Sequence, residues 1–526
     1  MQTPPPPLSE LRAAAPDAAV LDAVETALVR HRAFGDSLYI RDRLAVSYRR
    51  RLHKLRAALP QAGMLADLLQ AAPAVRQRQL IGDTVLRCAV QHAMRQLTLG
   101  DAYGLPLPQC DTLFGLAAEH LRQGRPGGPL VAHLPSEAIL AGGADGNGAQ
   151  ATYVWRQPGE PPAASPVTPY AAAFLAVMEE NYGAPLSTPT ASDMAMLRRG
   201  VQLLDALLPR LTRSALSHVQ LLALFPKVGT WCGKASSSQF RVNGAIFLNQ
   251  ELIGNPWWLA EHLLHEALHQ KLYDFRHGHS LLAAGYERDE ASRVCSLWNA
   301  PDDSGSHYWD AHRTLAACHV YVQLALLCLQ AERQEERLAG MYGPIGSHMS
   351  GSRRAIDRAR YLGEQLREVS WPVLGAAGRQ MSNWLLAVLD ELDVERRPPG
   401  ASLHLLLDLY ARQSRKLDAF LIRPGTLQAD TLTQQARQEV SAARAALQAL
   451  GEDDERLAAA TATAGAHGMP DWPQARRQVL QALLPLAQDR SEENLKKDGY
   501  PQAHDIVRQM VQQSSRQLAA LGALGG

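Results

Sequence analysis

Apolar residues recur at helical spacing through most of this chain. Residues 8–123 include two stretches, 41–59 and 75–97, that are rich in leucine and arginine. In both stretches the apolar residues recur every three or four positions, with polar residues between them. This spacing is typical of amphipathic helices. The same pattern resumes at 169–211 and continues almost unbroken beyond Arg353. We therefore expect a mainly helical protein.

Short apolar runs interrupt the helical pattern in the middle of the chain. Residues 219–225 and 240–249 are predicted to be buried strands, the second with a turn signal at Asn243-Gly244, and a short strand is expected around 151–155. The fold class expected is mainly α with a small β-sheet (α+β), in which a zincin-like helix core is flanked by helical N- and C-terminal regions.

Shifts in composition suggest where the domains begin and end. Residues 124–168 are rich in glycine and proline and have few periodic apolar positions, which indicates a linker. We therefore predict a helical N-terminal region at 1–123, a linker at 124–168, a catalytic domain at 169–395 and a helical C-terminal region at 396–526.

Charge and hydropathy exclude some classes of function. The net charge is +1, from 53 basic and 52 acidic side chains, so the sequence has no overall electrostatic signature of nucleic-acid binding. Six scattered cysteines form no CxxC pair, and no apolar run is long enough to predict a membrane span. The first residues lack the features of a signal peptide. We expect a cytoplasmic protein, and nothing in the sequence indicates its oligomeric state.

The chemistry-bearing motif is His265-Glu-Ala-Leu-His269, within a helix that Asn255-Pro256 is expected to open. Residues four apart on a helix lie on one face, roughly 5 to 6 Å apart, so His265 and His269 can share one metal ion. Glu266 is placed to reach a metal-bound water. His262 lies one turn earlier, and we interpret it as a packing residue.

Two imidazoles need a further protein ligand. A metzincin would have glycine and histidine where this chain has Leu272 and Phe275, which excludes that class. A gluzincin-like carboxylate from a second helix is one alternative, and Glu290, in a cluster with Glu287 and Asp289, lies near the required spacing.

The other alternative is the predicted helix around residues 312–322. His312 and His319 are seven residues apart and share a face, and His319 lies in an apolar stretch. An arginine between them, Arg313, could hold a carboxylate with two parallel hydrogen bonds. An ordinary structural ion pair is the competing interpretation of Arg313.

Several short motifs in this order resemble the bacterial HExxH-motif peptide-modification proteins of ribosomal natural-product pathways. The motifs are Leu264-His-Glu-Ala-Leu-His-Gln-Lys-Leu272, Leu297-Trp-Asn-Ala-Pro301, His312-Arg-Thr-Leu315, Cys318-His-Val-Tyr-Val322, Arg354-Ala-Ile-Asp-Arg-Ala-Arg360 and Leu374-Gly-Ala-Ala-Gly-Arg379. The resemblance covers roughly residues 215–395, and Ile81-Gly-Asp-Thr-Val-Leu-Arg87 extends it upstream.

The resemblance implies an iron(II)- and 2-oxoglutarate-dependent β-hydroxylase that acts on a ribosomally made precursor peptide. It implies iron at His265 and His269, His319 as third ligand, and Arg313 as the residue that holds 2-oxoglutarate. The chain departs from the family at Asn299-Ala300, where a second arginine is often found, and in its long helical tail. What the resemblance implies about cosubstrate and substrate therefore rests on the motifs that match.

The motif alone favours a different reaction. In a zinc peptidase, the metal would polarise the scissile carbonyl, and Glu266 would act as the general base. Either enzyme would act on an extended peptide, which could add a strand beside the region around Gly244–Asn249. A requirement for 2-oxoglutarate, together with the identity of the bound metal, distinguishes the two hypotheses.

Overall fold

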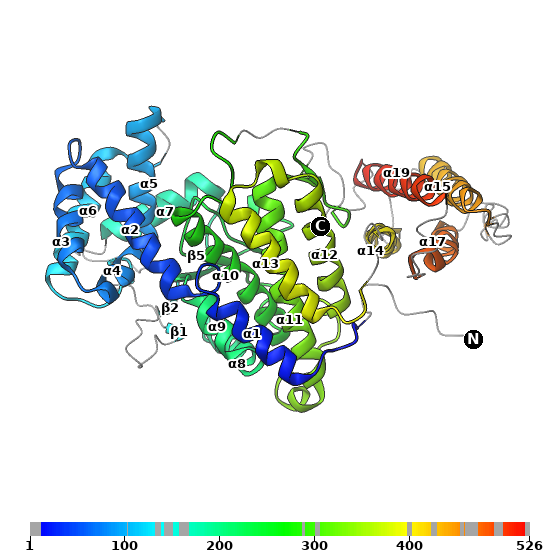
Figure 1. Ribbon diagram of the computed structural model, residues 1–526, viewed down its shortest axis with the longest axis horizontal. Helices are drawn as coiled ribbons and strands as arrows, with labels where there is room; N and C mark the ends of the chain where they lie inside the picture. Colours follow the sequence, from blue (N-terminus) through cyan, green and yellow to red (C-terminus); the bar gives the residue numbers. More distant parts are fainter. Residues whose placement is uncertain are drawn as a thin grey trace. The chain divides into compact units, whose positions relative to one another are not determined.

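The structure is a computed structural model. It describes residues 12–101, 104–131, 138–140, 151–156, 168–286, 290–299, 306–396, 402–421, 429–452, 457, 472–488 and 498–520. Helices dominate these residues and a small sheet accompanies them, which confirms the α+β expectation at this level (Figure 1). The chain forms two compact units: the first comprises 15–281 with 322–350, and the second comprises 1–14, 282–321 and 351–526.

The first unit begins with a run of packed helices, as the sequence pattern predicts (Figure 1). They are α1 (Ala18–Arg30), α2 (Ser37–Leu55), α3 (Pro60–Ala71), α4 (Ala74–Ile81), α5 (Thr84–Leu99) and α6 (Leu107–Arg122). Local chemistry explains several of the boundaries. Asp36 accepts the N–H groups of Leu38 and Tyr39 at the start of α2, and Asp83 accepts that of Leu86 at the start of α5.

A five-stranded sheet follows, in the order β1-β2-β3-β5-β4. Its strands are β1 (Ala138–Leu140), β2 (Thr152–Val154), β3 (Leu221–Phe225), β4 (Ser236–Ser237) and β5 (Ala245–Asn249). β3 is parallel to β2 and to β5, whereas β4 pairs antiparallel with β5 at the sheet edge. The strands expected around 151–155 and 219–225 are therefore confirmed.

The strand expected over residues 240–249 is only partly correct. The strand begins at Ala245, after Asn243 and Gly244, and residues 240–244 form turns. Gly244 has a φ of 87°, a backbone conformation that a side chain would strain. The turn signal therefore precedes the strand instead of lying inside it. β5 is an interior strand between β3 and β4, so the edge beside it belongs to β4.

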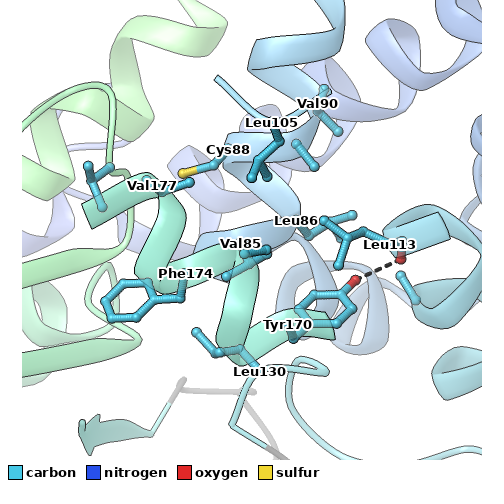
Figure 2. Packing of buried hydrophobic residues seen from close by; sticks show 14 of the residues in the cluster. Val85, Leu86, Cys88, Val90, Leu105, Leu113, Leu130, Tyr170, Phe174 and Val177 are labelled. Atoms are coloured by element: carbon cyan, nitrogen blue, oxygen red, sulfur yellow. Dashed lines mark hydrogen bonds between the residues drawn. The ribbon is translucent and has the colours of Figure 1, made fainter. Parts of the chain in front are cut away.

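β3 and β5 are buried along their whole length, which explains their unbroken apolar sequences. One face of these strands joins the main core with side chains from the N-terminal helices, including Leu113, Phe114 and Val85. Figure 2 shows this packing, in which the Tyr170 hydroxyl donates a 2.8 Å hydrogen bond to the Leu113 carbonyl. The core thus unites early helices with strands more than a hundred residues later.

Five helices complete the first unit or enter it. They are α7 (Thr168–Tyr182), α8 (Ala191–Leu207), α9 (Pro209–Leu216), α10 (Pro256–Gly278) and α11 (Ala311–Tyr342). α10 packs against α2, α8, α9 and β5. α11 is longer than the apolar segment that predicted it, and it is the one helix among the described residues with the length and apolarity of a membrane span. Within its most apolar window 83% of the residues are buried, as in a core helix.

In the second unit the described residues form helices and a two-stranded ladder of β6 (Val294–Cys295) and β7 (Tyr308–Trp309). Its elements beyond residue 350 are α12 (Ser352–Glu368), η3 (Trp371–Val373), α13 (Ala376–Leu392), α14 (Leu403–Leu421), α15 (Ala429–Ala449), α17 (Trp472–Gln488) and α19 (Tyr500–Ala520). A buried ion pair of 2.6 Å between Arg476 and Glu439 lies among the last four helices. The expectation of a nearly all-helical C-terminal region is confirmed for the described residues.

Candidate metal centre

The helix that carries the motif, α10, begins where the sequence predicts. The Asn255 side chain accepts hydrogen bonds from the N–H groups of Trp257 and Trp258, at 2.8 and 3.2 Å, and Pro256 occupies the first helical position. The Trp257 indole is buried and donates to the Gly343 carbonyl at 2.9 Å. These contacts fix the rotation of the helix about its axis, and thereby the face on which His265 and His269 lie.

His265 and His269 lie on one face, as predicted. Their ring centroids are 5.0 Å apart with the ring planes at 69°, and both residues are half-buried. Two imidazoles on adjacent turns are a donor set that suits zinc, iron and related divalent metals. Among the described residues, however, no group of three or more histidine, cysteine, aspartate or glutamate side chains is arranged to hold a metal ion. The two imidazoles alone therefore do not make a complete metal site in the described residues.

Glu266 is held by the sheet edge. It is 4% exposed, and its Oε1 accepts a 2.6 Å hydrogen bond from the Ser236 hydroxyl on β4. Sequence reasoning missed Ser236, because it lies 30 residues before Glu266 in a run of three serines without a recognisable motif. The contact places β4, an edge strand, directly beside the HExxH motif.

His262 has a packing environment. Its ring stacks on Trp258 with centroids 4.0 Å apart, and its Nδ1 lies 2.9 Å from the Trp258 carbonyl. Burial lowers the pKa of His262, which favours the neutral ring. These contacts support the interpretation of His262 as a packing residue.

The four further candidates, His312, Arg313, His319 and Glu290, belong to the second unit, so their roles at the metal stay predictions. His312 and His319 lie on the first turns of α11, and His319 is 1% exposed. Arg313 is exposed, with its guanidinium 4.8 Å from the centroid of the Trp309 ring and its Nη1 donating to the Ser306 carbonyl at 3.1 Å.

Glu290, the alternative carboxylate ligand, does not lie on a helix. Glu290 lies on a bend, its side chain is 91% exposed, and it forms a 3.4 Å ion pair with Arg293. A gluzincin-like ligand was expected on a second helix, and the described residues around Glu290 form turns and β6 instead. Glu287 and Asp289 lie outside the described residues.

A buried polar network anchors the far end of α10. Asp274 accepts from Arg87 Nη1 at 2.8 Å, and its second oxygen lies 2.7 Å from His218 Nδ1. Burial alone would raise the pKa of Asp274, but Arg87 and His218 outweigh it and lower that pKa. Arg87 ends the segment Ile81-Gly-Asp-Thr-Val-Leu-Arg87, so this upstream motif is joined to the metal-motif helix through an ion pair.

The same network extends to two further groups. His218 Nε2 lies 3.0 Å from the Ser37 hydroxyl, and Lys271 Nζ donates to the Ser214 hydroxyl at 2.9 Å. Burial lowers the pKa of His218 to about 4 and that of Lys271 to about 7. All of these side chains are satisfied by one another, so we interpret the network as structural. It ties α10 to α2, α5 and α9.

No protein-family model matches the chain, and no curated protein matches it.

Proposed function

We propose that the chain is a metal-dependent enzyme that modifies a peptide, with its metal on His265 and His269. The observation that carries the proposal is the pair of half-buried imidazoles on one face of α10, 5.0 Å apart, beside a glutamate that is hydrogen-bonded to an edge strand. Two imidazoles on adjacent turns of one helix face are a donor set for a divalent metal ion.

Peptide as the substrate class rests on β4. Among the described strands β4 pairs only with β5, so no described strand occupies its other edge. An extended peptide bound there would use its main chain for affinity. Because Ser236 on this strand contacts Glu266, such a peptide would lie beside the metal-binding face of α10.

The reaction we propose is hydroxylation of a side-chain carbon, with iron(II) and 2-oxoglutarate as cofactor and cosubstrate. This choice rests on the sequence resemblance. When bound, iron and 2-oxoglutarate would supply the oxidation by dioxygen, and the protein would supply His265, His269 and a third ligand, for which His319 is our choice. Arg313 would bind a carboxylate of 2-oxoglutarate.

Zinc peptidase chemistry is the second candidate, and the position of Glu266 favours it. Glu266 follows the first proposed ligand directly, and only its Oε1 is engaged by Ser236. The other carboxylate oxygen can accept a proton from a water molecule, as a general base must. Under this proposal Ser236 orients the base.

Turnover measurements decide between the two. The protein is purified without oxygen, loaded with iron(II) or zinc, and incubated with a peptide encoded beside its gene. The hydroxylase proposal expects an increase of 16 Da in the peptide, together with succinate formation, only with iron, oxygen and 2-oxoglutarate. Peptide cleavage with zinc alone, independent of 2-oxoglutarate, would establish the peptidase instead. His265→Ala should abolish either reaction, whereas His53→Ala, at an exposed histidine on α2, should not.

A further inference from the structure

A basic cavity lies where the side of α2 meets the end of α10. Its volume is about 270 Å³. It is lined by Arg43, Val46, Ser47, Arg50, Arg51, Lys54, His277 and Gly278. Four of these eight residues carry a positive charge, and none carries a carboxylate. The chain as a whole is almost neutral, so this concentration of one charge is local.

The charge of these four side chains is not compensated. Within the described part of the chain, Arg43, Arg50, Arg51 and Lys54 form no ion pair. The nearest acidic side chain on the same helix, Asp42, is already bound to Arg78 at 2.7 Å. Like charges that converge on one cavity repel one another, and a bound anion would remove that repulsion.

The walls of the cavity are held in place by contacts between the two helices and with the turn that precedes β5. The Ser47 hydroxyl donates to the His277 carbonyl at 2.8 Å, and the Asn243 amide lies 2.8 Å from His277 Nε2. Gly278 allows close approach, because a Cβ there would lie 3.0 Å from the Arg43 Cβ. The arginines therefore project from a rigid corner and not from a loop.

The state of His277 reflects the same positive environment. Burial is the main reason that its pKa lies well below the ordinary value, and Arg51 lowers it further. The ring is therefore neutral, and the charge of the cavity comes from the four long cationic side chains. Guanidinium groups of this kind bind phosphate oxygens with two parallel hydrogen bonds.

We propose that this cavity is a binding site for a small anion that carries phosphate groups, separate from the metal-binding face of α10. The volume is close to the lower end of ligand pockets, which span roughly 300–1,000 Å³. It suits a compact ligand with one or two phosphate groups. Phosphate on a soluble molecule and phosphate on a lipid headgroup share this chemistry, and we assign the soluble form because the cavity is a recess between two helices.

Calorimetric titration with inorganic pyrophosphate at low ionic strength tests the assignment. Binding should occur, weaken as sodium chloride is added, and weaken by at least about tenfold in Arg50→Ala/Lys54→Ala. Both residues are exposed, so the double variant should fold. The control Arg30→Ala/Arg367→Ala removes two exposed charges elsewhere and should bind like the parent.

Three results would overturn the assignment. The first is no binding of pyrophosphate by the parent protein. The second is equal weakening in both double variants, which would show a nonspecific charge effect. The third is capture on vesicles that contain phosphatidic acid, or on RNA, without binding of pyrophosphate.

Discussion

The hydroxyl of Ser236 donates a 2.6 Å hydrogen bond to Glu266, and this contact joins the edge strand β4 to the helix that carries the HExxH motif. Removing such a donor from a buried carboxylate lowers the free energy of unfolding by about 1–3 kcal/mol. We therefore expect Ser236→Ala to lower the thermal unfolding midpoint measurably. Ser237→Ala, on the next residue of β4, is the matched control and should have the smaller effect.

The same variant separates the role of Glu266 from metal binding. If the two imidazoles hold the metal and Glu266 is the general base, Ser236→Ala should retain the bound metal and lose catalytic rate. Metal content measured beside turnover checks this split. Loss of metal in Ser236→Ala, with unchanged folding, would show that Glu266 is itself a ligand.

The buried ion pair of Arg87 and Asp274 should be essential for stability. Both side chains are at most 1% exposed, and removal of one partner leaves the other buried and uncompensated. Asp274→Asn should therefore cost about 3–5 kcal/mol, seen as a large drop in the thermal midpoint. Asp67→Asn breaks the exposed pair of Arg56 and Asp67, so it should cost less than about 1 kcal/mol. Similar effects of the two variants would contradict the role of the network.

His218 should make the protein sensitive to acid. Its folded pKa of about 4 lies below the ordinary value of 6.5, because the ring is buried. As the pH falls from 6.5 to 4, the unfolded chain binds a proton that the folded chain does not, so stability falls through this window. His218→Gln removes this titration. The thermal midpoint of the parent should therefore approach that of His218→Gln as the pH falls from 6.5 to 4.

Arg313 provides a test of the cosubstrate. If it holds a carboxylate of 2-oxoglutarate, Arg313→Ala should raise the apparent KM for 2-oxoglutarate by about tenfold, equivalent to 1.4 kcal/mol. Arg293→Ala removes a neighbouring arginine that pairs with Glu290 and should leave that KM unchanged. If Arg313→Ala leaves the KM for 2-oxoglutarate unchanged, Arg313 does not bind this cosubstrate.

Local sequence predicted the features that depend on neighbouring residues. The Asn255-Pro256 start of α10 and the apolar strand β3 follow from capping and burial, so their positions could be predicted. The contacts of Ser236 with Glu266 and of Arg87 with Asp274 could not, because they join residues 30 and 187 positions apart. β5 starts at Ala245 and not at residue 240, as the apolar run predicts. The residues before it form turns, and the last of them, Gly244, has a positive φ that does not belong to a strand.

Metal titration of the pure protein tests the central claim most directly. Iron(II) or zinc is added to metal-free protein, and bound metal is measured after removal of excess. The account predicts one equivalent in the parent and in His53→Ala, and none in His265→Ala or His269→Ala, with helical content unchanged. If both α10 variants bind metal as the parent does, His265 and His269 do not hold a metal ion.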